Sequence, residues 1–170
     1  VAANGSCGST TADKSFTVYY NPSAASNGTS TAAICETSTK TISGNGTPSI
    51  VTGGGSISGS TYTPANITSN TTVKIRYTVA ANGSCGSTTA DKSFTVNSNP
   101  GAASNTTSTA SICEGSTKTV AGSPSGGSWG DNGTGSISGT TYSTGSISSD
   151  ESVIVTYTIA ANGACGSTSA

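Results

Sequence analysis

Five cysteines are the residues of this chain with the clearest chemistry, because thiols form disulfides or bind metal ions. Cys35 and Cys85 are 50 residues apart, and Cys113 and Cys165 are 52 apart. These spacings predict the disulfides Cys35–Cys85 and Cys113–Cys165, with Cys7 left without a partner. A metal site is not expected, because the chain has no histidine and no two cysteines separated by two residues.

An internal repeat of the sequence explains the two cysteine spacings. VAANGSCGSTTADKSFTV at 1–18 returns unchanged at 79–96, and AASNGTSTAAICE at 24–36 returns as AASNTTSTASICE at 102–114. Two further residues enter the second copy before GSISG, which lengthens its cysteine spacing. The pattern is typical of a piece of a longer array of repeats. Cys7 corresponds to Cys85, so its partner is expected in a repeat upstream of Val1. We divide the chain into the C-terminal hairpin of a preceding repeat (1–18), a complete repeat (19–96) and a repeat lacking its last strand (97–170).

Alternation of apolar and polar residues predicts the strands that position these cysteines. In TTVKIRYTV and ESVIVTYTI every second residue is apolar or aromatic, as in a strand with one face on a core. The Asn-Gly of AANGSCG favours a tight turn, so Thr72–Ala80 and Ser87–Val96 are predicted to form a hairpin. We therefore expect an all-β sandwich, with shorter strands at Ala33–Ile42, Ser49–Thr52, Ser56–Ser58 and Thr61–Thr63.

Composition and charge argue against several classes of partner. Only 8% of the residues are charged and the net charge is −1, so no basic surface is expected for nucleic acid or acidic lipid. No apolar run approaches the roughly 20 residues of a membrane helix, so this segment is not expected to span a membrane. The expected disulfides indicate an oxidising location: the periplasm, the cell surface or the medium.

Catalysis is not expected from this sequence. Serine is abundant, but no histidine is present to activate it as a nucleophile. Asp150 and Glu151 precede a strand and are expected to mark a turn, and Glu36 and Glu114 follow cysteines at equivalent places, which favours a local structural role. The glycine-rich segments have no following helix, so neither phosphate nor a cofactor is expected to bind.

Trp129, in GGSWG, is the single tryptophan of the chain. We expect its ring in the core of the second repeat, with Ile50 or Val51 near the equivalent place of the first. An exposed ring could instead stack on a sugar. A carbohydrate-binding module would use the aromatic candidates Trp129, Tyr19, Tyr20, Tyr62 and Tyr142.

The order of the motifs resembles a known family of repeats. SICEGSTKTVAGSPSGGSW, then GSISGTTY, then VIVTYTIAANGACGST is similar to the Ig-like or PKD-like repeats of giant cell-surface proteins of Bacteroidota, such as gliding-motility adhesins of the SprB kind. The first repeat has Thr37 in place of Gly115 and no tryptophan. The resemblance implies tandem β-sandwiches arranged end to end, exported by type IX secretion and displayed at the outer surface of the cell, with no catalytic residues.

These observations predict a structural segment, a stalk or filament, of a large secreted adhesin that extends a binding tip from the cell. Its partners would be neighbouring repeats, other copies in a filament, and glycans or substrata bound through other regions. One alternative is a pilin-like filament subunit, in which Val1–Val18 of one molecule completes Asn97–Ala170 of the next by strand addition and Cys7 competes with Cys165 for Cys113. The second alternative is a carbohydrate-binding module.

Overall fold

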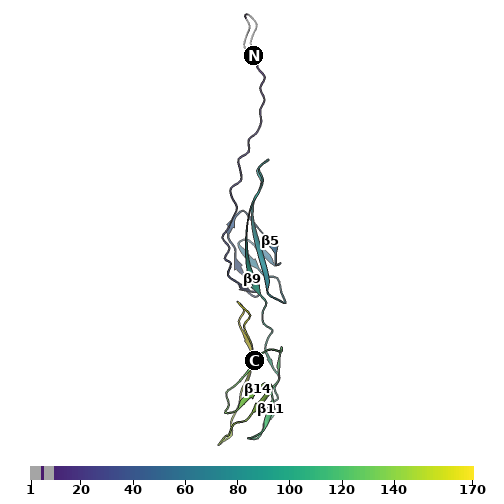
Figure 1. Cartoon of the computed structure of the whole chain (residues 1–170), viewed down its shortest axis with the longest axis vertical. Helices are drawn as coiled ribbons and strands as arrows, with labels where there is room; N and C mark the ends of the chain where they lie inside the picture. The colour runs from purple at the N-terminus through teal and green to yellow at the C-terminus, as the bar shows by residue number, and fades with distance from the viewer. Residues whose placement is uncertain (1–4, 6–9) are drawn as a thin grey trace.

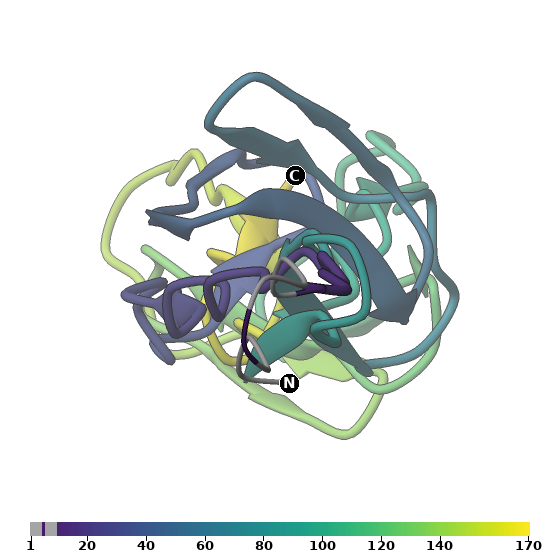
Figure 2. The same ribbon diagram turned by 90° about the horizontal axis from the view of Figure 1, so that it is seen from above.

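The fold is known from a computed structural model, which describes Gly5 and residues 10–170; every regular element in this part of the chain is a β-strand. The expectation of an all-β protein is therefore confirmed. The strands form two groups that follow one another along the long axis of an elongated molecule (Figure 1). Seen along that axis, both groups fall within one outline (Figure 2). Residues 10–18 contain no strand and run as an extended segment beyond the first group (Figure 1).

The first repeat contains strands β1 to β9. Their bounds are β1 Ser26–Asn27, β2 Ile34–Cys35, β3 Lys40–Thr41, β4 Gly44–Asn45, β5 Thr47–Thr52, β6 Ser56–Ser58, β7 Thr61–Thr63, β8 Thr71–Val79 and β9 Thr88–Asn97. β2, β9, β8 and β5 form one sheet in that order, β3, β7 and β6 form a second, and β1 pairs with β4. All pairings are antiparallel except that of β2 with β9, which is parallel.

The second repeat contains strands β10 to β17. Their bounds are β10 Ser104–Asn105, β11 Thr117–Thr119, β12 Gly122–Ser123, β13 Ser128–Asp131, β14 Ser136–Ser138, β15 Thr141–Ser143, β16 Val155–Ile159 and β17 Thr168–Ser169. The pairings β13–β16–β17, β11–β15–β14 and β10–β12 correspond to those of the first repeat. Residues 112–113, which correspond to β2, do not form a strand.

The hairpin expected to close each repeat is present in the first. β8 pairs with β9 along the whole length of β8, from Thr71 opposite Val96 to Val79 opposite Thr88. The two short strands β6 and β7 have the predicted bounds. The strand predicted over Ala33–Ile42 is wrong in its extent, because a turn closed by the Ser38 amide and the Cys35 carbonyl (2.9 Å) divides it into β2 and β3.

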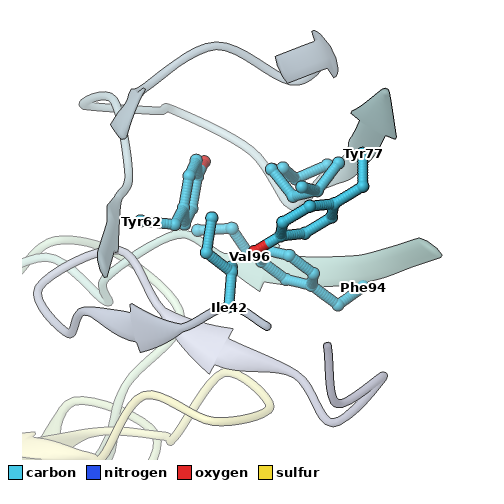
Figure 3. Packing of buried hydrophobic residues seen from close by; sticks show 7 residues of the cluster. Ile42, Tyr62, Tyr77, Phe94 and Val96 are labelled. Carbon is cyan, nitrogen blue, oxygen red and sulfur yellow. The ribbon is translucent and has the colours of Figure 1, made fainter. Parts of the chain in front are cut away.

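The core of the first repeat lies between its two larger sheets (Figure 3). Tyr62 and Phe94 meet edge to face, with ring centroids 5.4 Å apart and planes at 77°. The Tyr62 hydroxyl donates to the Gly54 carbonyl at 3.0 Å, and burial raises the pKa of this phenol. The alternation in β8 and β9 therefore supplies one apolar face, and the buried cluster consists of Ile42, Tyr62, Val73, Ile75, Tyr77, Phe94 and Val96.

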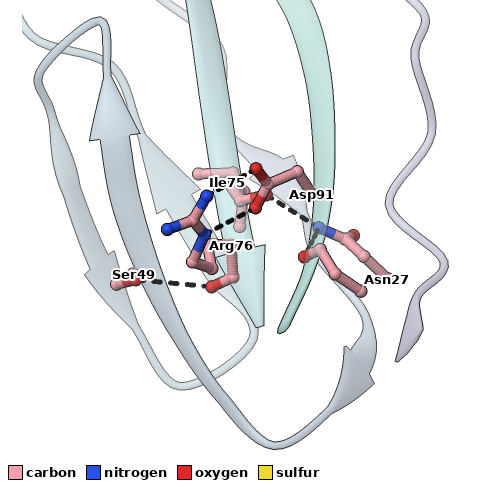
Figure 4. Close-up of polar contacts among 6 residues, drawn as sticks. Asn27, Ser49, Ile75, Arg76 and Asp91 are labelled. Atoms are coloured by element: carbon pink, nitrogen blue, oxygen red, sulfur yellow. Dashed lines mark hydrogen bonds and ion pairs between the residues drawn. The ribbon is translucent and has the colours of Figure 1, made fainter. Parts of the chain in front are cut away.

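Polar contacts join the two strands of the β8–β9 hairpin on its outer face, and other polar contacts hold β1 against the hairpin (Figure 4). Arg76 donates from Nε and Nη2 to the two carboxylate oxygens of Asp91, at 2.8 Å each. The hydrogen bond from Arg76 lowers the pKa of Asp91 below its ordinary value. Asn27 Nδ2 donates to the carbonyls of Ile75 (2.9 Å) and Ala90 (3.4 Å), which fixes β1 across both strands of the hairpin.

Candidate functional site

A disulfide between Cys35 and Cys165 joins the two repeats, with their Cα atoms 4.7 Å apart. Cys85 and Cys113 are free thiols. The predicted pairs Cys35–Cys85 and Cys113–Cys165, and with them the expectation of one disulfide within each repeat, are therefore wrong. Cys7 lies outside the described residues.

The parallel strand β2 explains why the predicted pairing fails. β2 places Cys35 opposite Asn97, at the end of β9 where the second repeat begins. Cys85 lies in the turn at the other end of the same hairpin, before Thr88. At about 3.3 Å per residue, the ten residues of β9 separate the two places by about 30 Å. A disulfide between Cys35 and Cys85 would therefore require the hairpin to come apart.

Cys165 reaches Cys35 from the corresponding turn of the second repeat. Asn162 and Cys165 close this turn with two backbone hydrogen bonds, of 3.1 and 3.0 Å. The turn is part of the yellow segment that extends from the second repeat towards the first (Figure 1). Both bonded cysteines are buried, with 6% of Cys35 and 2% of Cys165 exposed. The disulfide is thus enclosed by the junction between the repeats.

Asn97 is the buried polar residue at the centre of this junction. Its side-chain Oδ1 accepts a hydrogen bond from the Ala164 amide at 2.9 Å. Its carbonyl accepts from the Glu36 amide at 3.0 Å and lies 3.2 Å from Cys165 Sγ. One residue therefore contacts the strand of the first repeat and the turn of the second. The side-chain oxygen and the backbone carbonyl of this residue therefore have hydrogen-bond partners, as is usual for buried polar groups.

A second set of hydrogen bonds surrounds Asn162. Its Nδ2 donates to the Ser98 carbonyl (2.8 Å) and to Asn70 Oδ1 (2.8 Å), and Asn70 Nδ2 donates back to Asn162 Oδ1 (3.2 Å). The Ser98 amide also donates to Asn70 Oδ1, at 3.0 Å. A loop of the first repeat, the connecting segment and the turn of the second repeat are therefore tied together by two asparagine side chains.

Glu36 fixes the connecting segment to the first repeat. Its carboxylate accepts from the amides of Ile67 and Asn99, each at 3.0 Å. Glu114, its equivalent, accepts from the Ile147 amide at 3.2 Å. The contacts agree with the local structural role expected for both glutamates.

Gly163 provides a test of the junction, because it lies in the left-handed region with φ of 56°. A Cβ atom there would lie 2.5 Å from Asn97 Oδ1. We expect Gly163→Ala to lower the free energy of unfolding by about 1 to 3 kcal/mol, since it adds backbone strain and displaces Asn97. Chemical denaturation measures the change. Gly166→Ala is the matched control, because a Cβ there meets open space; an equal loss in both variants would contradict the role given to Gly163.

A similar arrangement lies before the first repeat. Asn82 and Cys85 close the equivalent turn, and Asn82 Nδ2 donates to the Tyr20 carbonyl at 3.0 Å. The Cys85 thiol donates to the Tyr19 carbonyl at 3.5 Å. The carbonyls of Tyr19 and Tyr20 therefore contact the cysteine and the asparagine of this turn. The carbonyls of Asn97 and Ser98 make the same contacts with the turn of the second repeat.

Trp129 is half-buried against Tyr157, with ring centroids 4.6 Å apart. It lies opposite Tyr157 in the pairing of β13 with β16. In the first repeat Pro48 holds this place, opposite Tyr77, so the expected equivalence with Ile50 or Val51 is wrong. The ring also borders a shallow hollow whose other walls include Gly122, Ser123 and Thr140.

Comparisons with protein-family models, curated proteins and solved structures found no match to this chain. In the part of the chain that the structure describes, no helix is long and apolar enough to cross a membrane. The same residues contain no cluster of three or more side chains suited to hold a metal ion.

Sequence reasoning missed the asparagines of the junction. Asn162 recurs in the sequence as Asn82 and Asn4, and an Asn-Gly pair by itself indicates only a turn. The recurrence of this asparagine three residues before a cysteine is the sequence signal of its second role, in the junction. Asn97 gave no such signal, since tyrosine occupies the equivalent position 19.

Proposed function

We propose that this chain is a structural segment of the stalk or filament of a large secreted cell-surface adhesin, which holds a binding tip away from the cell. The proposal rests on one observation, the disulfide that joins successive repeats at a hydrogen-bonded junction. The role is mechanical, without catalysis, and each repeat acts as an Ig-like β-sandwich in an array arranged end to end.

The junction is suited to transmit force between repeats. The connecting segment of Asn97 to Pro100 is short, and its polar groups are bound by Glu36, Asn70 and Asn162. Short, bound connections restrict bending between neighbouring units, unlike flexible linkers. The disulfide adds a covalent path across the same place, so tension would pass through the bond as well as through the backbone.

The disulfide also favours a location outside the cytoplasm, because such bonds persist in oxidising compartments. The weakly charged surface, rich in serine and threonine, is compatible with an exposed spacer that does not bind polyanions. Display at the outer surface of a bacterial cell is the part of the proposal carried by the sequence resemblance.

The test is immunogold electron microscopy of cells that make the protein, with an antibody raised against the purified chain. We expect label along thin surface filaments of intact cells, and a Cys35–Cys165 disulfide in material shed from them, detected by non-reducing mass spectrometry. Permeabilised cells are the control for internal antigen. Label confined to the cell interior, or both cysteines recovered as free thiols, would contradict the proposal.

A further inference from the structure

The hollow beside the Trp129 ring has a volume of ≈570 Å³, and the residues that line it all belong to the second repeat. Small-molecule sites usually have volumes of about 300 to 1,000 Å³. The Trp129 side chain is half-buried, so part of it stays open to the hollow. It lies on the edge strand β13, and β16 separates this strand from β17. The open ring is therefore at the edge of the sheet that is farther from β17.

The loop before Trp129 holds the aromatic wall of the hollow in place. The hydroxyl of the buried Tyr157 donates to the Pro124 carbonyl (2.6 Å) and accepts from the Gly127 amide (2.8 Å). Cβ atoms at Gly122 and Gly127 would lie 2.5 and 2.4 Å from the Tyr157 ring, so this close approach needs glycine. Tyr157 in turn supports the Trp129 ring, whose centroid is 4.6 Å away. A ring that is already fixed lowers the entropy cost of binding a ligand.

The rest of the lining is uncharged and rich in hydroxyl groups. The hydroxyls of four lining residues make no hydrogen bond to any other residue that the structure describes; these are Thr119, Ser123, Ser125 and Thr140. Each can therefore donate to a ligand or accept from it. None of the described residues that line the hollow is charged, so the hollow offers no ion pair to an ionised ligand.

The tryptophan and the long loop before it are particular to the second repeat. In the first repeat Pro48 lies opposite Tyr77, in the place that Trp129 has in the second. The segment from Gly44 to Pro48 is three residues shorter than the segment from Gly122 to Trp129. The first repeat closes its core without these features, so a spacer repeat of this kind does not require them.

We propose that this hollow binds a neutral sugar unit of a glycan, with one pyranose ring packed against Trp129. A pyranose ring has a face of C–H groups, which packs on an aromatic ring, and hydroxyls around its rim. The threonine and serine hydroxyls of the hollow pair with those of the sugar. The second repeat would thereby contact glycans, which goes beyond the proposed mechanical role.

The experiment follows the fluorescence of Trp129, because the chain has a single tryptophan and its emission reports on the hollow directly. The whole oxidised chain is titrated with four probes, the tetrasaccharides of glucose, galactose, mannose and N-acetylglucosamine. It is also applied to an array of neutral and acidic glycans. We expect saturable changes in emission with at least one neutral probe and a Kd of about 0.1 to 10 mM, since the site is shallow and uncharged.

Variants of the hollow should weaken this binding, measured by calorimetry. Trp129→Ala should weaken it at least about tenfold, and Trp129→Phe should bind better than Trp129→Ala because it keeps a ring. Thr140→Ala should weaken it about three- to tenfold, since one hydroxyl is lost. Ser60→Ala is the matched control, because the Ser60 carbonyl accepts from the Ile42 amide as the Thr140 carbonyl accepts from the Val120 amide. It should bind as the wild type does.

Denaturant unfolding shows whether each variant is folded, and Thr140→Ala keeps the test decisive if Trp129→Ala does not fold. A chain that binds none of the four probes and no neutral glycan on the array would overturn the inference. Unchanged binding by folded Trp129→Ala, or a preference for acidic glycans, would overturn it too. These results do not depend on the Cys35–Cys165 bond, so the proposed spacer role is tested separately.

Discussion

Replacing Cys35 or Cys165 by serine is expected to lower the free energy of unfolding by about 5 kcal/mol. The bond closes a loop with a sequence separation of 130 residues, and the entropy lost by the unfolded chain grows with the length of that loop. Denaturant unfolding of the oxidised proteins measures the loss. The two single variants should be equally destabilised, and the double variant should not be less stable than either, because all three lack the same bond.

Cys113→Ser is the control for the substitution itself, because Cys113 is exposed and free in the single molecule. Its unfolding should match that of the wild type under dilute, monomeric conditions. Reductant should destabilise the wild type to the level of Cys35→Ser and leave that variant unchanged. A wild type that is insensitive to reductant would show that the two repeats are not joined by this bond.

The sequence could not decide between this pairing and the predicted one. Each repeat carries one early and one late cysteine, so pairing within a repeat and pairing across the junction use the same residues. Loops of 50 and 130 residues differ in closure cost by only about 0.9 kcal/mol, which does not discriminate between them. The parallel pairing of β2 with β9 determines which disulfide forms, because it places Cys35 at the junction. The sequence does not predict this pairing, because a strand of two residues is too short to show a periodic pattern.

The longer strands could be predicted because they contain enough residues to show the alternation of apolar and polar side chains. Nine residues of β8 alternate, and Val73, Ile75 and Tyr77 are all buried as that alternation requires. The short strands β6 and β7 were also predicted, since glycine and serine at 59–60 separate two apolar centres. The sequence shows that DKSFTV occurs after the late cysteine in two places, whereas the difference in exposure between Phe16 and Phe94 required the structure.

The two copies of DKSFTV allow a matched test of how much burial of the phenylalanine ring contributes to the free energy of unfolding. Phe94→Ala is expected to lower the free energy of unfolding by about 3 to 5 kcal/mol, because it removes a buried aromatic ring from the core. The ring contacts Tyr62 edge to face and lies under the Lys40 ammonium, so both contacts are lost with it. Phe16→Ala changes the same residue in the same local sequence, where the ring is 85% exposed, and should leave monomer unfolding within about 0.5 kcal/mol of the wild type.

The two substitutions are expected to differ because the Phe94 ring contacts Tyr62 and the Lys40 ammonium within the first repeat, whereas the Phe16 side chain is exposed to solvent. Chemical denaturation of both variants measures the difference. A large loss of stability in Phe16→Ala would show that this ring is buried in its own molecule. A Phe94→Ala effect below about 1 kcal/mol would show that β9 does not close the core of the first repeat.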